Sequence, residues 1–318
     1  MLSIGIDLGG TNIAGAIVGP DHNIIYKDSV KTNAPRPVEE IAADIADLCR
    51  KMCADNGTDM ADIGFVGVAS PGIIQGDMVE TANNLGFYNA PLGRLVSEDL
   101  KKKVYLQNDA NIAAYAEALL GAGKDANSLV LITLGTGVGG GIILNKRIYD
   151  GFNGAGAELG HVIIDAGGKQ CGCGKKGCLE AYCSATALIR ETKEAMEKDR
   201  YSTMWELCDG DIDKVDGKTA FDGMRRNDKS AKAVVRAFIH YLAVGISNVI
   251  TLLQPEVVCI GGGLSRENEY ILTPLRSELR KLSLLREDQS EAMVKIARFE
   301  NDAGVIGASL LGYKDFKF

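Results

Sequence analysis

The sequence predicts an α/β protein built from two lobes. Its 318 residues suit about two domains at roughly 150 residues each. Short β-rich runs alternate with longer segments whose apolar residues recur at helical spacing, which is typical of sheets flanked by helices. Two glycine-rich turns, at Gly9–Gly10 and Gly135–Gly141, each lie between two β-rich runs. This echo predicts one such turn per lobe, with a ligand cleft between the lobes.

The first lobe is predicted to begin with a hairpin and then to alternate helices and strands. Its expected elements are strands over 2–7, 12–18 and 23–32, a helix over 38–55, strands over 63–69 and 104–107, and an alanine-rich helix over 109–121. Pro35 and Pro37 precede the first helix as a start signal. Glycine, proline and aspartate separate the early strands, as expected of turns.

The second lobe is predicted to be mostly helical around a smaller sheet. Its expected elements are strands over 129–134 and 139–144, an irregular stretch rich in glycine and cysteine over 150–178, helices over 185–198, 218–226 and 231–253, a strand over 257–260 that runs into three glycines, and a helix over 270–281.

Composition and charge exclude several classes of function. The chain has 35 Lys and Arg against 42 Asp and Glu, which gives a net charge of −7. An acidic chain repels the phosphate backbone, so we expect no nucleic-acid binding. No apolar run approaches about 18 residues, and the start of the sequence lacks the features of a signal peptide. We therefore expect a cytoplasmic protein with no membrane partner.

The two glycine-rich turns are candidate phosphate cradles, because glycine lets backbone N–H groups approach a phosphate. In the first turn, Asp7 would hold Mg²⁺ and Thr11 would supply a hydroxyl; a plain polar hairpin turn is the alternative. The second turn has glycines at 135, 137 and 140, which is the spacing of a dinucleotide-binding loop. That loop requires a helix immediately afterwards, whereas residues 142–144 predict a strand. A hairpin over phosphates therefore fits better.

His161, Cys171, Cys173 and Cys178 form a candidate metal site. Eight cysteines in an intracellular chain are not expected to pair as disulfides, and a tight C-x-C-x4-C cluster is typical of metal binding. Three thiolates and one imidazole make a closed tetrahedral Zn²⁺ site of the structural kind. Free surface thiols are the alternative. Cys183 would be a fifth ligand and is left out.

Polar residues near these segments suit a polyhydroxylated ligand, whose hydroxyls need both donors and acceptors. They are Asn84, Asn108, Asp109, Glu158 and Glu180. Asp109 follows a predicted strand and begins a predicted helix, so helix capping is one interpretation. Acceptance of a proton from a substrate hydroxyl is the other. Glu158 and Glu180 bracket the proposed zinc loop, and a rigid metal clip would fix where both carboxylates point.

Five motifs taken together resemble the ROK family (repressor, open reading frame, kinase), in the family's order and over nearly the whole chain. They are Asp7-Leu-Gly-Gly-Thr-Asn12, Asn108-Asp109-Ala-Asn111, Leu134-Gly-Thr-Gly-Val-Gly-Gly-Gly141, Gly156-Ala-Glu-Leu-Gly-His161 and Cys171-Gly-Cys-Gly-Lys-Lys-Gly-Cys-Leu-Glu180. The resemblance implies a two-lobed actin-like ATPase (ribonuclease H-like) fold with a central ligand cleft. It also implies a small lobe over 1–117, a large lobe with the zinc loop over 118–302, and a C-terminal helix over 303–318 that returns to the small lobe, beginning at about 303–312.

The resemblance further implies the role of each site residue. Asp109 matches the catalytic base that takes the proton of the sugar 6-hydroxyl. The implied sugar ligands are Asn84, Asn108, Asp109, Glu158, His161 and Glu180, with His161 serving zinc and sugar through different ring nitrogens. The implied nucleotide and Mg²⁺ residues are Asp7, Gly9, Gly10, Thr11, Asn12, Gly135, Thr136, Gly137, Gly262 and Gly263. One departure is the sequence Ala82-Asn83-Asn84-Leu85, where the family often has Pro-Asn-Leu.

The expected activity is therefore ATP-dependent phosphorylation of the 6-hydroxyl of glucose, with ATP, Mg²⁺ and structural Zn²⁺ bound and a homodimer as the assembly. A kinase for another hexose or an N-acetylated aminohexose (fructose, mannose, allose or N-acetylmannosamine) is the alternative in the same class. A sugar-responsive repressor is a third hypothesis, disfavoured because the first strand begins at Leu2 and leaves no room for a DNA-binding domain.

Overall fold

The structure of the chain, a computed structural model, describes residues 1–282 and 293–313. It forms two compact units. Unit 1 contains Met1–Ser128, Gly141–Ala157 and the C-terminal segment from Asn301, and unit 2 contains Leu129–Gly140 and Glu158–Glu300. The predicted lobe boundaries at 117 and 302 stay a prediction. Residues 283–292 and 314–318 of the predicted lobes lie outside the described residues.

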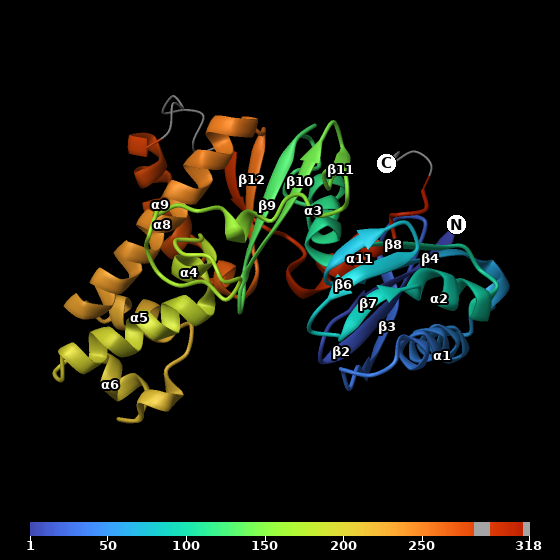
Figure 1. Ribbon diagram of the computed structural model, residues 1–318, viewed down its shortest axis with the longest axis horizontal. Helices are drawn as coiled ribbons and strands as arrows, with labels where there is room; N and C mark the ends of the chain where they lie inside the picture. Colours follow the sequence, from blue (N-terminus) through green and yellow to red (C-terminus); the bar gives the residue numbers. More distant parts are fainter. Residues whose placement is uncertain (283–292, 314–318) are drawn as a thin grey trace. The chain divides into compact units, whose positions relative to one another are not determined.

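The elements of unit 1 come mainly from the first part of the chain, with one strand and one helix added from later segments (Figure 1). They are β1 (Leu2–Leu8), β2 (Asn12–Val18), β3 (Ile24–Lys31), α1 (Val38–Asn56), η1 (Met60–Asp62), β4 (Ile63–Ser70), β5 (Ile73–Gln75), β6 (Met78–Ala82), β7 (Phe87–Ala90), α2 (Leu92–Leu100), β8 (Val104–Asn108), α3 (Asp109–Leu119), β11 (Arg147–Tyr149) and α11 (Ala303–Ala308).

Unit 2 carries most of the helices (Figure 1). Its elements are β9 (Leu129–Leu134), η2 (Leu159–His161), α4 (Glu180–Cys183), α5 (Ala185–Lys198), α6 (Met204–Leu207), η3 (Ile212–Lys214), α7 (Thr219–Arg225), α8 (Lys229–Leu253), β12 (Val257–Gly261), η4 (Gly263–Glu267), α9 (Glu269–Leu282) and β13 (Val294–Ile296). The strand β10 (Val138–Leu144) passes from unit 2 into unit 1, and the short turn η5 (Glu300–Asp302) does the same near the end of the chain.

The main sheet of unit 1 has the strand order β3-β2-β1-β4-β8. The first three strands pair antiparallel, whereas β4 is parallel to both β1 and β8. The register places Asp7 beside Ala69, and Ser70 beside Asn108. Because the carboxyl ends of parallel strands meet at one edge, Asp7 and Asn108 lie at the same edge of this sheet. A separate antiparallel sheet, β5-β6-β7, follows β4.

The two faces of this sheet are covered differently, because successive side chains of a strand point to opposite faces. Ile4, Ile6 and Leu8 are fully buried in a cluster with the apolar residues of α1. The opposite face of the sheet packs closely against α11. A Cβ atom at Gly67 of β4 would lie 1.8 Å from the carbonyl oxygen of Ala308. Glycine is therefore required there for the C-terminal helix to reach the sheet.

In unit 2, β12 lies between β9 and β13 and is parallel to both. Gly261 pairs with Thr133, so the glycines that follow β9 and β12 lie at one edge of the sheet. The helix α8 is long and apolar enough by composition to cross a membrane, but 61% of its most apolar window is buried inside the protein. It packs against α5, α7 and α9, which identifies it as a core helix.

The structure differs from the sequence prediction mainly in short elements. The strands β5, β6 and β7, the helix α2 and the strands β11 and β13 were not predicted. The helix predicted over 109–121 ends at Leu119, and the helix predicted over 303–312 ends at Ala308 and continues as turns. Three- to five-residue strands are too short for a recurring apolar pattern to identify them.

Candidate functional site

The start of α3 fixes the predicted catalytic residue. Asn108, not Asp109, is the N-cap: its Oδ1 accepts hydrogen bonds from the N–H groups of Ala110 at 3.0 Å and Asn111 at 3.1 Å. Its Nδ2 donates to the carbonyl of Gly72 at 3.0 Å. The interpretation of Asp109 as the cap is therefore wrong, because β8 extends one residue further than predicted. Asn108 therefore supplies the N-cap, and Asp109 adds a hydrogen bond to the first turn of α3 through Oδ1 alone.

Asp109 and Asp7 are two half-buried carboxyl groups within unit 1. Oδ1 of Asp109 accepts a hydrogen bond from the Ala110 N–H at 2.8 Å. Burial raises the pKa of Asp109 above its usual value. Burial, together with the negative charge of Asp109, raises the pKa of Asp7 from 3.8 to about 6. A carboxylate with a raised pKa is a better proton acceptor near neutral pH. Two neighbouring like charges also favour a cation between or beside them.

The raised pKa of Asp7 predicts a pH-dependent cost in stability. The folded state holds the Asp7 proton more tightly than the unfolded state does, so protonation of Asp7 stabilises the fold. That stabilisation is complete below pH 3.8 and is lost as the pH rises through about 6. At pH 8 the charged, buried carboxylate then costs about 3 kcal/mol. We expect Asp7→Asn to raise the free energy of unfolding of the ligand-free protein by about that amount at pH 8, and by almost nothing at pH 4. Denaturant unfolding at both pH values measures this.

The exposed Asp125 provides the matched control, because Asp125→Asn removes the same charge from a solvated position. A gain for Asp7→Asn that is equal at pH 4 and pH 8, or no gain at either, would contradict the account of Asp7.

The first glycine turn joins β1 to β2 beside Asn84. The Gly9 N–H donates to the Asn12 carbonyl at 2.9 Å, and the Thr32 hydroxyl donates to the Gly9 carbonyl at 2.6 Å. A Cβ atom at Gly10 would lie 3.7 Å from Nδ2 of Asn84, so the turn and Asn84 are neighbours. Gly10, Thr11 and Asn84 are exposed. Unit 1 therefore brings its predicted phosphate turn and its predicted sugar residue together.

The second glycine turn, between β9 and β10, is held by the start of α5. The Ala185 N–H donates to the Gly135 carbonyl at 2.8 Å, and the Thr186 hydroxyl donates to the Thr136 carbonyl at 2.8 Å. The turn is followed by a strand, as expected of a hairpin and not of a dinucleotide-binding loop. Gly262 packs against the end of β9, because a Cβ atom there would lie 2.5 Å from the Leu134 carbonyl oxygen. The two predicted nucleotide segments of unit 2 are thus neighbours.

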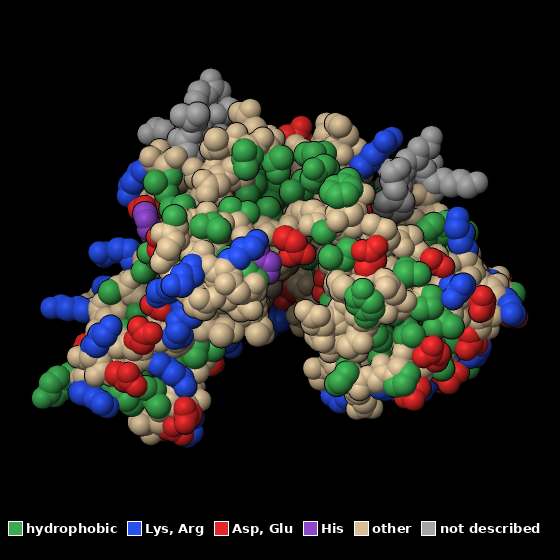
Figure 2. Space-filling view, viewed as in Figure 1, with side chains coloured by type: hydrophobic (Ala, Val, Ile, Leu, Met, Phe, Trp, Pro, Cys, Tyr) green, Lys and Arg blue, Asp and Glu red, His purple; other side chains and the backbone are tan. Residues whose placement is uncertain are grey.

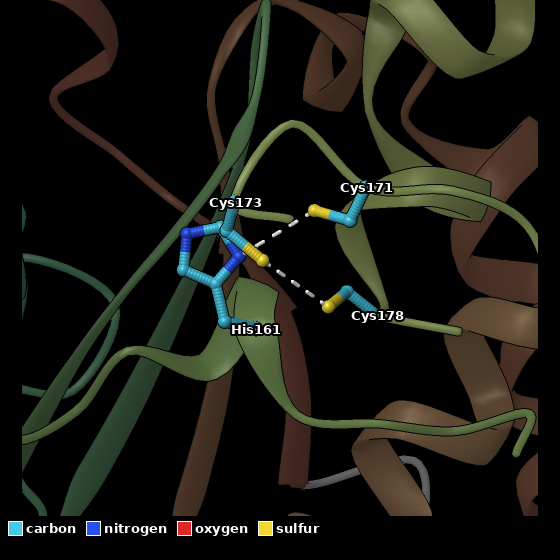
Figure 3. Close-up of side chains that lie close together, drawn as sticks. All are labelled: His161, Cys171, Cys173 and Cys178. Carbon is cyan, nitrogen blue, oxygen red and sulfur yellow. Dashed lines mark hydrogen bonds between the residues drawn. The ribbon is translucent and has the colours of Figure 1, made fainter. Parts of the chain in front are cut away.

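The predicted zinc ligands lie together in unit 2 (Figure 3). The ligand atoms of His161, Cys171, Cys173 and Cys178 all lie within 4.8 Å of one another. Sγ of Cys171 is 3.8 Å from Nδ1 of His161, and Sγ of Cys173 is 3.7 Å from Sγ of Cys178. The other ring nitrogen of His161 points away from the sulfur atoms (Figure 3).

These distances fit a tetrahedral zinc ion. With zinc–sulfur bonds of about 2.3 Å, the sulfur atoms of a tetrahedral site lie about 3.8 Å apart. Burial raises the pKa of the Cys171 thiol to about 12. The raised pKa favours the protonated thiol. A bound zinc ion would instead favour the thiolate, because zinc holds its cysteine ligands deprotonated.

Glu180 connects this cluster to the second glycine turn. Its Oε1 lies 3.5 Å from Sγ of Cys171, and its Oε2 accepts a hydrogen bond from the Val138 N–H at 3.0 Å. A Cβ atom at Gly137 would lie 2.4 Å from Oε2, so a larger residue there would displace this carboxylate. Glu158, by contrast, is exposed just before η2, and no hydrogen bond joins its side chain to the residues that the structure describes. The expected support from the metal loop is thus visible for Glu180 alone.

Three residues near the predicted site were not predicted from the sequence. Gly72 supplies the carbonyl that holds Asn108. Gly304 of α11 lies against Asp7, since a Cβ atom there would be 2.4 Å from Oδ2. Gln107 hydrogen-bonds the Asn108 N–H. Only Gly72 carried a signal, as the glycine of the Ser-Pro-Gly turn that ends β4.

Comparisons with known proteins show which family this chain resembles. The ROK family model matches residues 3–314. A glucokinase from Halalkalibacterium halodurans is 37% identical over 314 residues, covering 97% of this chain and 94% of that protein. An N-acetylmannosamine kinase from Haemophilus influenzae is 32% identical, with coverages of 97% and 94%. A crystal structure of a ROK family glucokinase from Streptomyces griseus in complex with glucose and AMPPNP is 32% identical, with a TM-score of 0.80 over 97% of this chain and 98% of that chain.

The family model covers almost the whole chain, and the glucokinase from Halalkalibacterium halodurans matches at well over 30% identity along nearly its full length. The likeness in three dimensions confirms the predicted fold class, a mixed α/β fold of the actin-like ATPase type. The chain belongs to the ROK family.

Proposed function

We propose that this chain is an ATP-dependent glucokinase, which transfers the γ-phosphoryl group of ATP to the 6-hydroxyl of glucose. The observation that carries the proposal is the Asp109 carboxylate at the β8–α3 junction, where Asn108 provides the N-cap and burial raises the pKa of Asp109. Glucokinase relatives that match almost the whole chain support the choice of sugar.

Asp109 is the proposed general base. Its carboxylate accepts the proton of the 6-hydroxyl as the hydroxyl oxygen attacks the γ-phosphorus, and ADP leaves. Phosphoryl transfer depends chiefly on positioning and on neutralising the charge of the phosphates. The helix α3 supplies the positioning, because the Asp109 backbone is fixed by the hydrogen bonds of Asn108 to the helix end and to Gly72. A positioned base of this kind contributes about 10²–10⁴-fold to the rate.

The two glycine turns are the proposed phosphate sites, with Gly262 and Gly263 on the adenosine side. The triphosphate would be bound by backbone N–H groups at the first turn, Gly9–Asn12, and the second turn, Gly135–Gly137. Asp7 fits a divalent cation, because its half-buried carboxylate carries the added repulsion of Asp109. Mg²⁺ held there would neutralise phosphate charge when ATP is bound.

We propose six sugar ligands. Asn84, Asn108 and Asp109 belong to unit 1, and Glu158, His161 and Glu180 belong to unit 2. The donor and acceptor atoms of these side chains suit a ligand with several hydroxyls. The Asn108 amide is already engaged at both ends within unit 1, so we propose that it contributes at most one N–H to the sugar.

The structural zinc ion is proposed to be held by His161, Cys171, Cys173 and Cys178. It would supply rigidity and no reaction step. His161 would bind zinc through Nδ1, which leaves its outer ring nitrogen for the sugar (Figure 3). A cytoplasmic location and a homodimer complete the proposal.

We propose no nucleic-acid partner, because the charge of the chain does not favour binding to a phosphate backbone. Lys and Arg side chains are interspersed with Asp and Glu on the face drawn in Figure 2, and the chain is acidic overall.

A kinase for N-acetylmannosamine is the second candidate, favoured by relatives at 32% identity. A panel of glucose, mannose, fructose, allose and N-acetylmannosamine with ATP and Mg²⁺ separates the two, with ADP release as the common readout. We expect the highest kcat/KM for glucose. A higher value for N-acetylmannosamine would replace the proposed sugar, and no ADP release with any sugar would overturn the kinase.

A further inference from the structure

Gln107 directly precedes the Asn108–Asp109 pair, and both ends of its side-chain amide are engaged. Its Oε1 accepts a hydrogen bond from the Asn108 N–H at 2.7 Å. Its Nε2 donates to Oδ2 of Asp150 at 3.2 Å. Gln107 and Asp150 are both half-buried, so water competes with this bridge only in part. The side chain therefore joins the backbone beside the catalytic base to a residue 43 positions along the chain.

Asp150 begins the loop 150–157, which leads from β11 towards Glu158. The Gly156 N–H closes this loop by donating to the Asp150 carbonyl at 2.7 Å. The loop is also held at its middle, where Nε2 of Gln75 donates to the Asn153 carbonyl at 3.1 Å. A Cβ atom at Gly154 would lie 2.3 Å from the Ile74 carbonyl oxygen, so β5 packs directly against the loop.

Each of these contacts lies within unit 1. The contacts at Asn153 and Gly154 join the loop to β5, whereas the one at Asp150 joins it to β8, the strand that leads into Asp109. The Gln107 side chain thus joins the backbone next to Asp109 to loop 150–157 by hydrogen bonds. This loop continues along the chain to Glu158 and His161.

We propose that Gln107 is a positioning residue for the sugar site, which sets loop 150–157 relative to the Asn108–Asp109 pair through its bond to Asp150. The proposal rests on the proposed kinase function, because Asp109 and Glu158 are taken as sugar ligands. In this proposal Gln107 contacts neither the sugar nor the nucleotide. Its effect is expected on sugar binding, and not on the nucleotide turns at Gly9–Asn12 and Gly135–Gly137.

The bridge requires residue 107 to accept one hydrogen bond and donate another. Glutamate has the same shape as glutamine, but when ionised it only accepts. Gln107→Glu would keep the bond from the Asn108 N–H and would face Asp150 with a like charge. Asp150→Asn keeps an acceptor for Nε2 of Gln107, so it should be tolerated. In the double variant, the new amide at position 150 would donate to the new carboxylate at position 107, and the bridge would re-form with its polarity reversed.

The test is a double-variant cycle read as KM for glucose, KM for ATP and kcat, with thermal unfolding of each variant. We expect Gln107→Glu to raise the KM for glucose about tenfold, with the KM for ATP and the melting temperature almost unchanged. Asp150→Asn should stay near the wild type, and the double variant should recover most of the loss. Gln254→Glu, at the exposed C-cap of α8, is the charge-matched control.

Three results would overturn the positioning role. They are a wild-type KM for glucose in Gln107→Glu, an equal rise of both KM values together with a lower melting temperature, and a double variant no better than Gln107→Glu. If the wild type prefers another hexose, the same comparison is made with that sugar. Failure of the sugar assignment and failure of the positioning role are therefore seen separately.

Discussion

Asp109→Asn is expected to lower kcat by about 10²–10⁴-fold, because the amide cannot accept the proton of the sugar hydroxyl. Sugar binding should survive, since asparagine has the same shape and can still accept a hydrogen bond from the Ala110 N–H. Titration calorimetry with glucose and a coupled ADP assay measure the two effects separately. Activity of the wild type should also fall on acidification, because the raised pKa of Asp109 causes it to protonate above the usual range.

Asp125→Asn is the control for this change, as it removes one carboxylate from an exposed position of the same unit. Near-normal kcat in Asp109→Asn would show that another group accepts the proton. Loss of glucose binding along with kcat would instead assign Asp109 to binding alone.

Cys178→Ser is expected to lower both the melting temperature and the affinity for glucose. A hydroxyl is a much poorer zinc ligand than a thiolate, and a structural zinc site contributes directly to folding stability. Without the metal, Cys171 loses its fixed position beside Glu180, and that carboxylate also holds the Val138 N–H. Metal analysis should find about one zinc ion per chain in the wild type, and much less in the variant.

Cys208→Ser is the matched control, because Cys208 is a buried thiol outside the cluster whose bond to the Met204 carbonyl a serine hydroxyl can replace. A wild type that contains no zinc and keeps its activity would contradict the metal assignment. So would an equal loss in Cys178→Ser and Cys208→Ser.

The fold could be predicted where apolar periodicity and turn residues agree. The strands Asn12–Val18 and Leu129–Leu134 and the helix Ala185–Lys198 match their predictions to the residue. The sheet β5-β6-β7 could not be predicted, because its short strands are identified by their pairing partners and not by a pattern of their own. The close contact of α11 with Gly67 also joins residues too distant in sequence for a local pattern to reveal.

Some site residues could likewise be predicted from a local sequence pattern, and others could not. The metal cluster was visible because three of its four ligands lie within eight residues of one another. The capping residue was assigned one position too late, since asparagine and aspartate cap equally well and the exact end of β8 decides between them. The Gln107–Asp150 bridge could not be predicted, because the two residues lie 43 positions apart and no local pattern shows which polar side chains the fold brings together.

The most direct test of the central claim is a crystal structure of this protein with glucose and a non-hydrolysable ATP analogue. We expect a carboxylate oxygen of Asp109 to lie about 2.6–3.2 Å from the 6-hydroxyl oxygen, with that hydroxyl oxygen facing the γ-phosphate. A sugar bound with its 6-hydroxyl out of reach of Asp109, or a γ-phosphate held away from both glycine turns, would contradict it.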